Sequence, residues 1–149
     1  MGKVIAAFAG TGKSYIGGKY PKAIDLDLGS FRWIYDGDES LPYEQRKAMR
    51  MFEQNPNFPQ NYIDAIIKAK ENFDLVFVSN AQEISHLIDY NFIPSSTAWD
   101  TLEQRYRARK NPERFIEIFK ALFDMGFTDG IVIDDNEFLE QALIKEGLL

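Results

Sequence analysis

The chain has 149 residues, of which 45% are hydrophobic, and a formal net charge of −6. This length and composition predict one soluble globular domain with a sizeable core, and no apolar run is long enough to span a membrane. The acidic balance argues against general affinity for nucleic acid. Because the chain has no cysteine and its N-terminus lacks a signal-peptide pattern, we expect a cytoplasmic protein without disulfides.

The first predicted elements are a buried strand over residues 4–8 and a helix that begins near Lys13. They are joined through the sequence Ala7-Phe8-Ala9-Gly10-Thr11-Gly12-Lys13-Ser14. A strand, a glycine-bearing loop that ends in Gly-Lys-Ser and a helix form the context that a phosphate-binding loop requires. Glycine lets the backbone approach phosphate oxygens, and successive N–H groups concentrate positive potential there. The usual pattern is G-x-x-x-x-G-K-[ST], and Ala7 stands where its first glycine belongs.

This loop predicts a set of nucleotide-binding residues. The residues expected to hold the phosphates are Ala9, Gly10, Thr11, Gly12, Lys13 and Ser14. Lys13 is expected to reach the terminal phosphates, and the Ser14 hydroxyl is expected to ligate Mg²⁺. The alternative interpretation is a glycine-rich turn followed by a surface lysine.

A second strand is predicted over residues 23–27, and it contains Asp25 and Asp27. Side chains alternate along a strand, so both carboxylates are expected on one side of it. Strand ends in an open α/β sheet face the ligand crevice. We therefore predict that Asp25 helps to hold Mg²⁺ through water. Asp27 is predicted to accept a hydrogen bond from a hydroxyl group of the substrate. The alternative is a solvated strand end, or an aspartate that caps the next turn.

Residues 30–57 are polar and irregular, and the resemblance to small kinases given below implies that they bind the acceptor of the phosphoryl group. Within this segment, Tyr43 to Gln54 could be helical because Pro42 suits a helix start. Arg46 and Arg50 on that helix are second candidates for contact with the acceptor.

The middle of the chain alternates helix-like and strand-like segments. A helix is predicted over residues 59–72 and a strand at the centre of the sheet over residues 75–78. This strand is followed by Ser79 and Asn80, without the carboxylate that usually ends it in motor or switch ATPases. Asn80 and Glu83 have capping-box spacing for a helix that contains Ile84, and a short strand is predicted over residues 91–94.

A basic helix is predicted over residues 99–110, where five basic and two acidic residues lie between 101 and 114. Arg105 and Arg109 are four residues apart and therefore project from one face, with Arg107 roughly opposite. Guanidinium groups match the charge and geometry of phosphoryl oxygens, so this pair is predicted to stabilise a phosphoryl group in transfer. The alternative is a solvated charged helix.

The remaining predictions are a helix from Pro112 to Gly126, a strand over 131–133 and a last helix that includes Leu139. The first of these helices is expected to bury five residues, namely Phe115, Ile118, Phe119, Leu122 and Phe123. Together the elements predict a three-layer α/β/α fold with a central, mostly parallel five-stranded sheet. The single histidine, His86, is expected to be a surface or packing residue.

The chain resembles the small P-loop kinases, which include nucleoside monophosphate kinases such as adenylate kinase and the related shikimate kinases. The resemblance covers the order of elements along the whole chain, and three motifs carry it. These are the loop around Gly10 to Ser14, the run Asp25-Leu26-Asp27, similar to the D-x-D of shikimate-type kinases, and Arg105-x-x-x-Arg109, similar to the arginine pair of a kinase lid. The chain looks closest to short, phage-type nucleotide kinase-like proteins.

The resemblance implies a protein that binds ATP and Mg²⁺ and passes the γ-phosphoryl group to a small acceptor, here a nucleotide or nucleoside. In monophosphate kinases an arginine shortly after the second strand binds the acceptor phosphate, and Arg32 stands in a comparable place beside Trp33, which could stack on a base. Lys13, Asp27, Arg105 and Arg109 are the expected catalytic residues. Two other functions stay open: a nucleotide-binding regulatory protein that transfers nothing, and a nucleoside triphosphatase.

Overall fold

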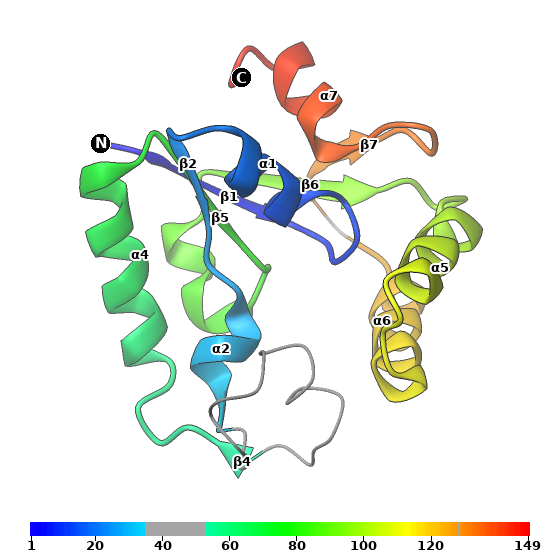
Figure 1. The fold of residues 1–149 in the computed structure, drawn as a ribbon, viewed down its shortest axis with the longest axis horizontal. Helices are drawn as coiled ribbons and strands as arrows, with labels where there is room; N and C mark the ends of the chain where they lie inside the picture. Colours follow the sequence, from blue (N-terminus) through cyan, green and yellow to red (C-terminus); the bar gives the residue numbers. More distant parts are fainter. Residues whose placement is uncertain (35–52, 128) are drawn as a thin grey trace.

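A five-stranded sheet forms the centre of the computed structural model, which describes residues 1–34, 53–127 and 129–149 (Figure 1). Its strands are β1 (Lys3–Ala7), β2 (Ala23–Asp25), β5 (Leu75–Val78), β6 (Tyr90–Pro94) and β7 (Ile131–Ile133). They lie in the order β2-β5-β1-β6-β7, and neighbouring strands are parallel throughout. The predicted α/β class and the five-stranded parallel sheet are therefore confirmed.

Helices cover both faces of this sheet. On one face α1 (Lys13–Lys19) and α7 (Leu139–Lys145) bury Ile16, Leu139 and Leu143 against the sheet. On the other face α4 (Gln60–Asn72) and the 3₁₀ helix η1 (Gln82–Leu87) bury residues such as Tyr62 and Ile84. Alternation along β1 explains the two cores, because Ile5 and Ala7 face α1 while Val4 and Ala6 face α4.

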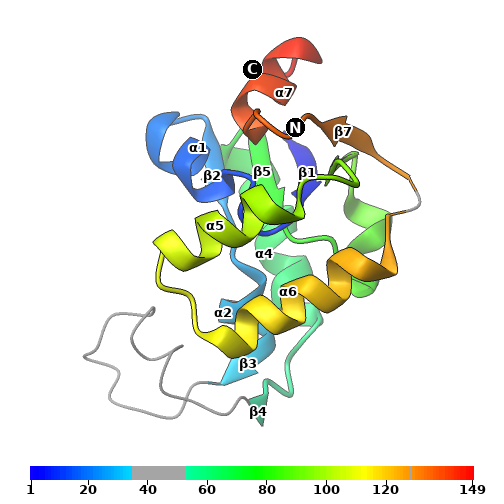
Figure 2. The same cartoon turned by 90° about the vertical axis from the view of Figure 1, so that its right-hand side faces the viewer.

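A helical pair, α5 (Trp99–Ala108) and α6 (Glu113–Met125), stands beside the end of the sheet, away from α4 (Figures 1 and 2). Its core is separate from the other two and includes Leu102, Tyr106 and Ile116, with Phe8 and Ala9 packed against it. Phe8 follows β1 directly, so the helical pair is attached to the segment that joins β1 to α1.

A smaller substructure follows β2 in the chain and packs against α4. Asp27 caps α2 (Leu28–Arg32), and its carboxylate accepts a hydrogen bond from the amide of Gly29 at 3.3 Å. The helix leads into β3 (Trp33–Ile34), which pairs antiparallel with β4 (Glu53–Gln54). The predicted helix over 43–54 is wrong at its last two residues, which form β4, and its other residues, with Arg46 and Arg50, lie outside the described part of the chain.

Three further predictions are wrong in detail. The second strand ends at Asp25, so Asp25 and Asp27 do not share a strand face. The capping box at Asn80 does not form, because Ala81 precedes a 3₁₀ helix without a side-chain cap. Ile118 and Leu122 are 44% and 47% exposed, since α6 packs on α5 and Phe8 rather than on the sheet.

No helix among the described residues is both long and apolar enough to cross a membrane.

Candidate functional site

The sheet topology marks one place where a ligand crevice is expected. Strands β1 and β5 are neighbours, but the chain leaves β1 toward α1 on one face and β5 toward η1 on the other. In open α/β sheets the crevice opens at the carboxyl ends of two strands whose connections diverge in this way. The β1–α1 loop, defined here as residues 8–12, and Ser79 at the end of β5 therefore flank the candidate site.

Positive backbone φ angles shape the β1–α1 loop. Gly10 has φ 81° and Gly12, which caps α1, has φ 111°. Both angles lie in the region that favours glycine. Ala7, where the usual phosphate-loop pattern has a glycine, belongs to β1 and has no positive φ, so its methyl group costs nothing there.

Three consecutive carbonyl groups of the loop are tied to surrounding elements. The carbonyl of Ala9 accepts a hydrogen bond from the Tyr106 hydroxyl at 2.7 Å, and that of Gly10 accepts one from the Arg105 guanidinium at 2.9 Å. The carbonyl of Thr11 accepts one from the amide of Leu139 at 2.8 Å. Because C=O and the following N–H point in opposite directions across a trans peptide, these contacts turn the next three amides away from α5 and α7.

The amides of residues 10–14 have no hydrogen-bond acceptor among the described residues. Amide groups left in this state need water or a ligand. Successive unpaired amides in a turn with positive φ form a concavity that attracts anions. The loop is therefore able to receive several anionic oxygen atoms.

Lys13 directly follows this loop and is the first residue of α1. Its ammonium group donates to the carbonyl of Ala7 at 2.9 Å and to the Ser79 hydroxyl at 3.1 Å, which bridges the ends of β1 and β5. Burial lowers the pKa of Lys13, and nearby Arg109 lowers it further, whereas Asp25 and Asp27 act to raise it. The next residue, Ser14, is exposed in the first turn of α1. A buried cation and an exposed hydroxyl thus adjoin the unpaired amides.

Asp25 occupies the end of β2 and packs against α1. A Cβ atom at Gly17 would lie 3.3 Å from the Cβ of Asp25, so this glycine admits the strand. The Oδ1 atom of Asp25 is buried without a hydrogen-bond partner in the described part of the chain. Burial raises the pKa of Asp25, as does Asp27, while Lys13 opposes the shift. Such an unpaired buried oxygen is unusual and calls for an explanation.

The oxygen-bearing side chains at the end of β2 and the start of α1 are of the types that one kind of metal site uses. Among the described residues, no three or more histidine, cysteine, aspartate or glutamate side chains are placed so that they could together hold a metal ion. Mg²⁺ is usually held by one or two carboxylates together with substrate phosphates and water. A buried carboxylate with an unpaired oxygen and the exposed Ser14 hydroxyl match that requirement, although Asp27 is partly engaged as a cap.

The structure separates the arginines of α5. Arg105 donates to the loop and also to the carbonyl of Glu137 at 3.4 Å, and its guanidinium lies 3.9 Å from the centroid of the Phe138 ring. Arg109 follows the helix, is exposed, and lies 5.9 Å from the centroid of the Tyr106 ring. Arg105 is thus committed to the loop, while Arg109 carries an exposed charge close enough to affect Lys13.

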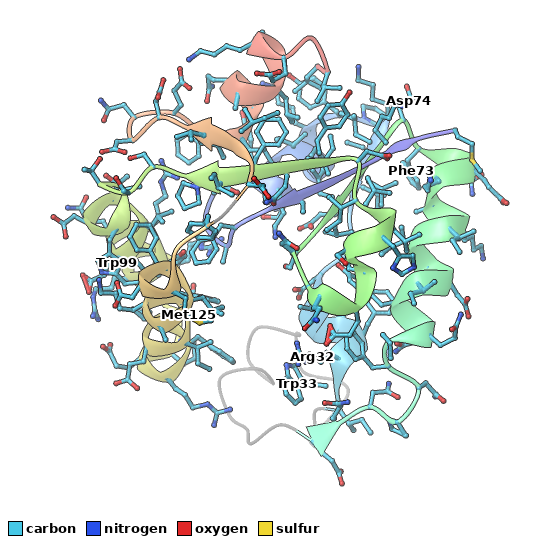
Figure 3. The ribbon with its side chains drawn as sticks, turned by 180° about the vertical axis from the view of Figure 1, so that it is seen from behind. Arg32, Trp33, Phe73, Asp74, Trp99 and Met125 are labelled. Atoms are coloured by element: carbon cyan, nitrogen blue, oxygen red, sulfur yellow. The ribbon has the colours of Figure 1, made fainter. Side chains whose placement is uncertain are left out.

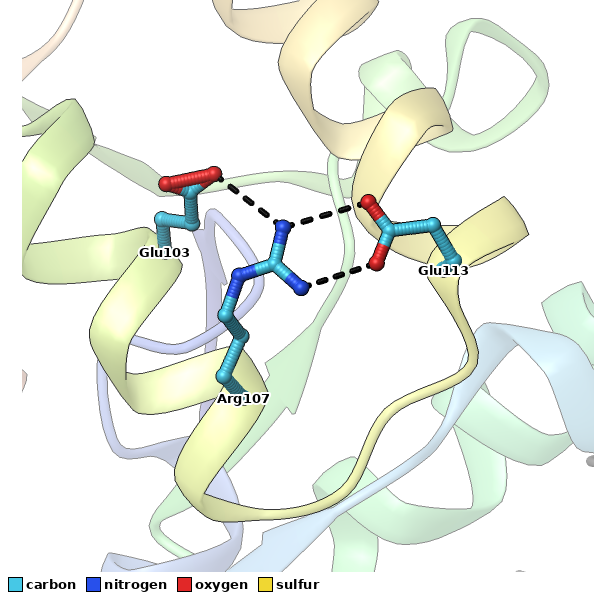
Figure 4. A network of polar contacts seen from close by, with 3 residues as sticks. All are labelled: Glu103, Arg107 and Glu113. Atoms are coloured by element: carbon cyan, nitrogen blue, oxygen red, sulfur yellow. Dashed lines mark hydrogen bonds and ion pairs between the residues drawn. The ribbon is translucent and has the colours of Figure 1, made fainter.

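Arg107 points away from the candidate site, as predicted. Its guanidinium donates to both carboxylate oxygens of Glu113, at 2.8 and 3.1 Å, and to Glu103 at 3.4 Å (Figure 4). These side chains are largely exposed, so the network links α5 to α6 with little gain in stability.

Arg32 and Trp33 lie where α2 passes into β3, across from Trp99 and Met125 on the α5–α6 side (Figure 3). The Arg32 guanidinium lies 5.3 Å from the ring centroid of Trp33 and 5.4 Å from that of Phe58. Its Nε atom is buried without a hydrogen-bond partner within the described ranges. Arg32 is therefore held by aromatic rings while part of its hydrogen-bonding capacity remains unused.

Sequence reasoning missed three residues of this site. Ser79 was noted only as the absence of a carboxylate, yet its hydroxyl contacts Lys13. Tyr106 lies between the predicted arginines but is fully buried and reaches the loop. Phe138 adjoins Gly12 and supports Arg105. For Ser79, its position directly after a central strand was a usable signal, whereas contacts across about a hundred residues leave no local pattern.

The chain matches no known family model, and no curated protein matches it. The functional interpretation therefore depends on the geometry of the site itself.

Proposed function

We propose that the protein is an ATP- and Mg²⁺-dependent small-molecule kinase of the P-loop type, which transfers the γ-phosphoryl group to a nucleotide or nucleoside. The observation that carries the proposal is the set of unpaired amides over residues 10–14, next to the Lys13 ammonium that bridges the carboxyl ends of β1 and β5. Unpaired amides and an ammonium group at the carboxyl ends of these strands suit an anionic ligand such as a polyphosphate.

The residues of the site have distinct roles in this proposal. The amides of residues 10–14 bind the β- and γ-phosphates, and Lys13 leaves its contacts with Ala7 and Ser79 to neutralise them. Ser14 and Asp25 would hold Mg²⁺, which supplies charge neutralisation between the phosphates when it is bound. Arg109 stabilises the charge on the phosphoryl group in transfer. The acceptor is positioned by Asp27, Arg32 and Trp33.

Little covalent chemistry is required of the chain. Phosphoryl transfer is accelerated mainly by alignment and by electrostatic stabilisation. If the acceptor is itself a phosphate, it needs no strong base. If it is a hydroxyl, Asp27 is the residue we assign to accept its proton. Transfer to the acceptor, rather than hydrolysis of ATP, requires that water is kept from the γ-phosphate.

A nucleoside triphosphatase is the less favoured enzyme. The residue after β5 is Ser79, and its hydroxyl is engaged with Lys13 rather than being a carboxylate that could orient a metal or water. A silent nucleotide-binding protein is also less favoured, because the missing first glycine of the loop falls in β1 where no positive φ is needed.

An ATP-consumption assay with and without a panel of nucleoside monophosphates and nucleosides separates these functions. Stimulation by one acceptor supports the kinase, acceptor-independent turnover supports a triphosphatase, and binding without turnover supports a regulatory protein. Lys13→Ala is expected to abolish turnover, whereas Lys68→Ala, which changes an exposed lysine of α4, is the matched control. Unchanged turnover in Lys13→Ala would rule out both enzymes.

A further inference from the structure

Two adjacent residues of α5 are attached to two adjacent peptide groups of the β1–α1 loop. Tyr106 donates to the carbonyl of Ala9 and Arg105 donates to that of Gly10, although about 95 residues separate them in the chain. Both contacts are made by a helix that also packs on α6 and on the segment after β1. The helix therefore holds the loop by its carbonyl side.

The fit between Tyr106 and Gly10 is close. Tyr106 is fully buried, and a Cβ atom at Gly10 would lie 2.6 Å from its Cε1 atom. No other residue at position 10 leaves room for the ring in this arrangement. Gly10 thus serves two needs, because it adopts a positive φ and also admits the tyrosine that fixes the preceding carbonyl.

We propose that Tyr106 and Arg105 are positioning residues that hold the loop carbonyls toward α5, so that the amides of Gly10 and Thr11 face the polyphosphate. This inference rests on the proposed function. Each trans peptide is planar, and a fixed carbonyl therefore fixes the direction of the next amide. Without the two contacts, either peptide can rotate and place its carbonyl oxygen, instead of its N–H, toward the anion.

The proposal divides the arginine pair of α5. Arg105 donates hydrogen bonds to the carbonyls of Gly10 and Glu137 and stacks on Phe138. It therefore acts on the phosphates through the loop. Arg109 has no such backbone contact in the described part of the chain, and it is the arginine left to meet the phosphoryl group directly.

The chain contains a matched control for Tyr106. Tyr62 is likewise fully buried, and its hydroxyl donates to a backbone carbonyl, that of Leu26, at 2.8 Å. Burial raises the pKa of both tyrosines, so both hydroxyls are protonated donors at neutral pH. Tyr62 packs between α4 and the sheet and does not contact the β1–α1 loop. Tyr62→Phe and Tyr106→Phe therefore remove the same kind of hydrogen bond at two places.

Calorimetric titration of MgATP into the full chain tests the inference. We expect both tyrosine variants to lower Tm by similar amounts, while Tyr106→Phe weakens MgATP binding about three- to tenfold more than Tyr62→Phe does. Equal affinity in the two variants would overturn the positioning role while leaving the proposed function in place. No MgATP binding by the wild-type chain would overturn the proposed function and this inference together.

A second pair of variants keeps the test decisive if Tyr106→Phe does not fold. Arg105→Lys keeps the charge but loses the planar fork that spans two carbonyls and the Phe138 ring, whereas Arg107→Lys alters only the exposed contacts with Glu103 and Glu113. In the acceptor-stimulated assay, Arg105→Lys is expected to raise KM for ATP about tenfold with KM for the acceptor unchanged. If Arg105→Lys and Arg107→Lys have the same KM for ATP, the role assigned to Arg105 is wrong.

Discussion

The two sides of the candidate site differ in whether their polar side chains have hydrogen-bond partners. On the loop side, the carbonyls of residues 9–11 are held by Tyr106, Arg105 and Leu139. On the β2–α2 side, Asp25 Oδ1 and Arg32 Nε are buried without partners among the described residues. Buried polar groups are nearly always paired, so the contrast separates a preformed site from one that a ligand must complete. We assign the first to the phosphates of ATP and the second to the metal and the acceptor.

The largest effect is expected from Gly10→Ala, because it breaks the preformed side. The new methyl group meets both a positive φ of 81° and the Tyr106 ring at 2.6 Å. Strain of about 1–2 kcal/mol and overpacking of about 1–3 kcal/mol are expected to add. We predict a marked fall in Tm together with loss of MgATP binding.

Gly12→Ala is the control for that variant. Its Cβ atom would meet nothing closer than Phe138 at 3.5 Å, so only the strain of φ 111° remains, about 1–2 kcal/mol. Thermal unfolding of both variants measures the difference. Equal losses of Tm would mean that the ring of Tyr106 does not press on the loop.

The fold was predictable where a pattern is local. Leu75–Val78 is a continuous apolar run in which the last three residues are β-branched or aromatic, and it forms the predicted buried strand with the predicted bounds. Gly126, with φ 83°, ends α6 as expected. The capping box at Asn80 was wrong, and the helix that contains Ile84 is a 3₁₀ helix, because capping-box spacing cannot distinguish a 3₁₀ turn from an α-helix. Ile118 and Leu122 were wrongly placed in the core because helical spacing identifies an apolar face but not its partner.

The candidate site likewise contains residues that a local pattern predicts and residues that no local pattern identifies. The loop and Lys13 are contiguous with a strand and a helix, so this strand–loop–helix arrangement could be predicted from sequence alone. Asp27 was correctly considered as a possible cap, and the structure makes it one. The contact of Tyr106 with Ala9 could not be predicted, because it depends on where α5 lies relative to β1 and not on either segment.

Arg32→Lys sharpens the comparison on the incomplete side. The variant keeps the charge but loses the planar group that lies over Trp33 and Phe58. We expect KM for the acceptor to rise about tenfold while KM for ATP stays within about twofold, measured in steady-state assays with each substrate varied. A rise confined to KM for ATP would contradict the assignment of the two sides.

Asp25→Asn is expected to raise the stability of the fold and to lower its activity. Burial raises the pKa of Asp25 above its ordinary value of 3.8, so the ionised carboxylate destabilises the fold at neutral pH. The variant should therefore have a higher Tm than wild type at pH 7. This difference should shrink as the pH falls through the raised pKa, and it should be smallest below pH 3.8, where both states of the wild type are protonated.

The same variant should lower turnover by about 10- to 100-fold, since an amide is a weaker metal ligand than a carboxylate. Thermal unfolding across the pH range and the ATP assay measure the two effects separately. A lower Tm at pH 7 would show that the electrostatic attraction of Lys13 for the Asp25 carboxylate outweighs burial.

The smallest effect is expected from Gly18→Ala, which leaves both sides of the candidate site unchanged. Gly18 lies in α1, its φ is not positive, and a Cβ atom added to it would have no neighbour within 4 Å among the described residues. Alanine is favoured over glycine in a helix by about 1 kcal/mol, which corresponds to about 2–4 °C in Tm for a chain of this size. MgATP binding should be unchanged, and a weaker affinity would mean that flexibility in α1 contributes to the site.

The central claim is that the unpaired amides of residues 10–14 bind a polyphosphate. Amide chemical shifts of the ¹⁵N-labelled chain, recorded before and after addition of MgATP, test it most directly. We predict that the largest shift changes occur at Gly10, Thr11, Gly12, Lys13 and Ser14, and that they are lost in Lys13→Ala. A spectrum that does not change, or one whose changes lie away from the β1–α1 loop, would contradict the account.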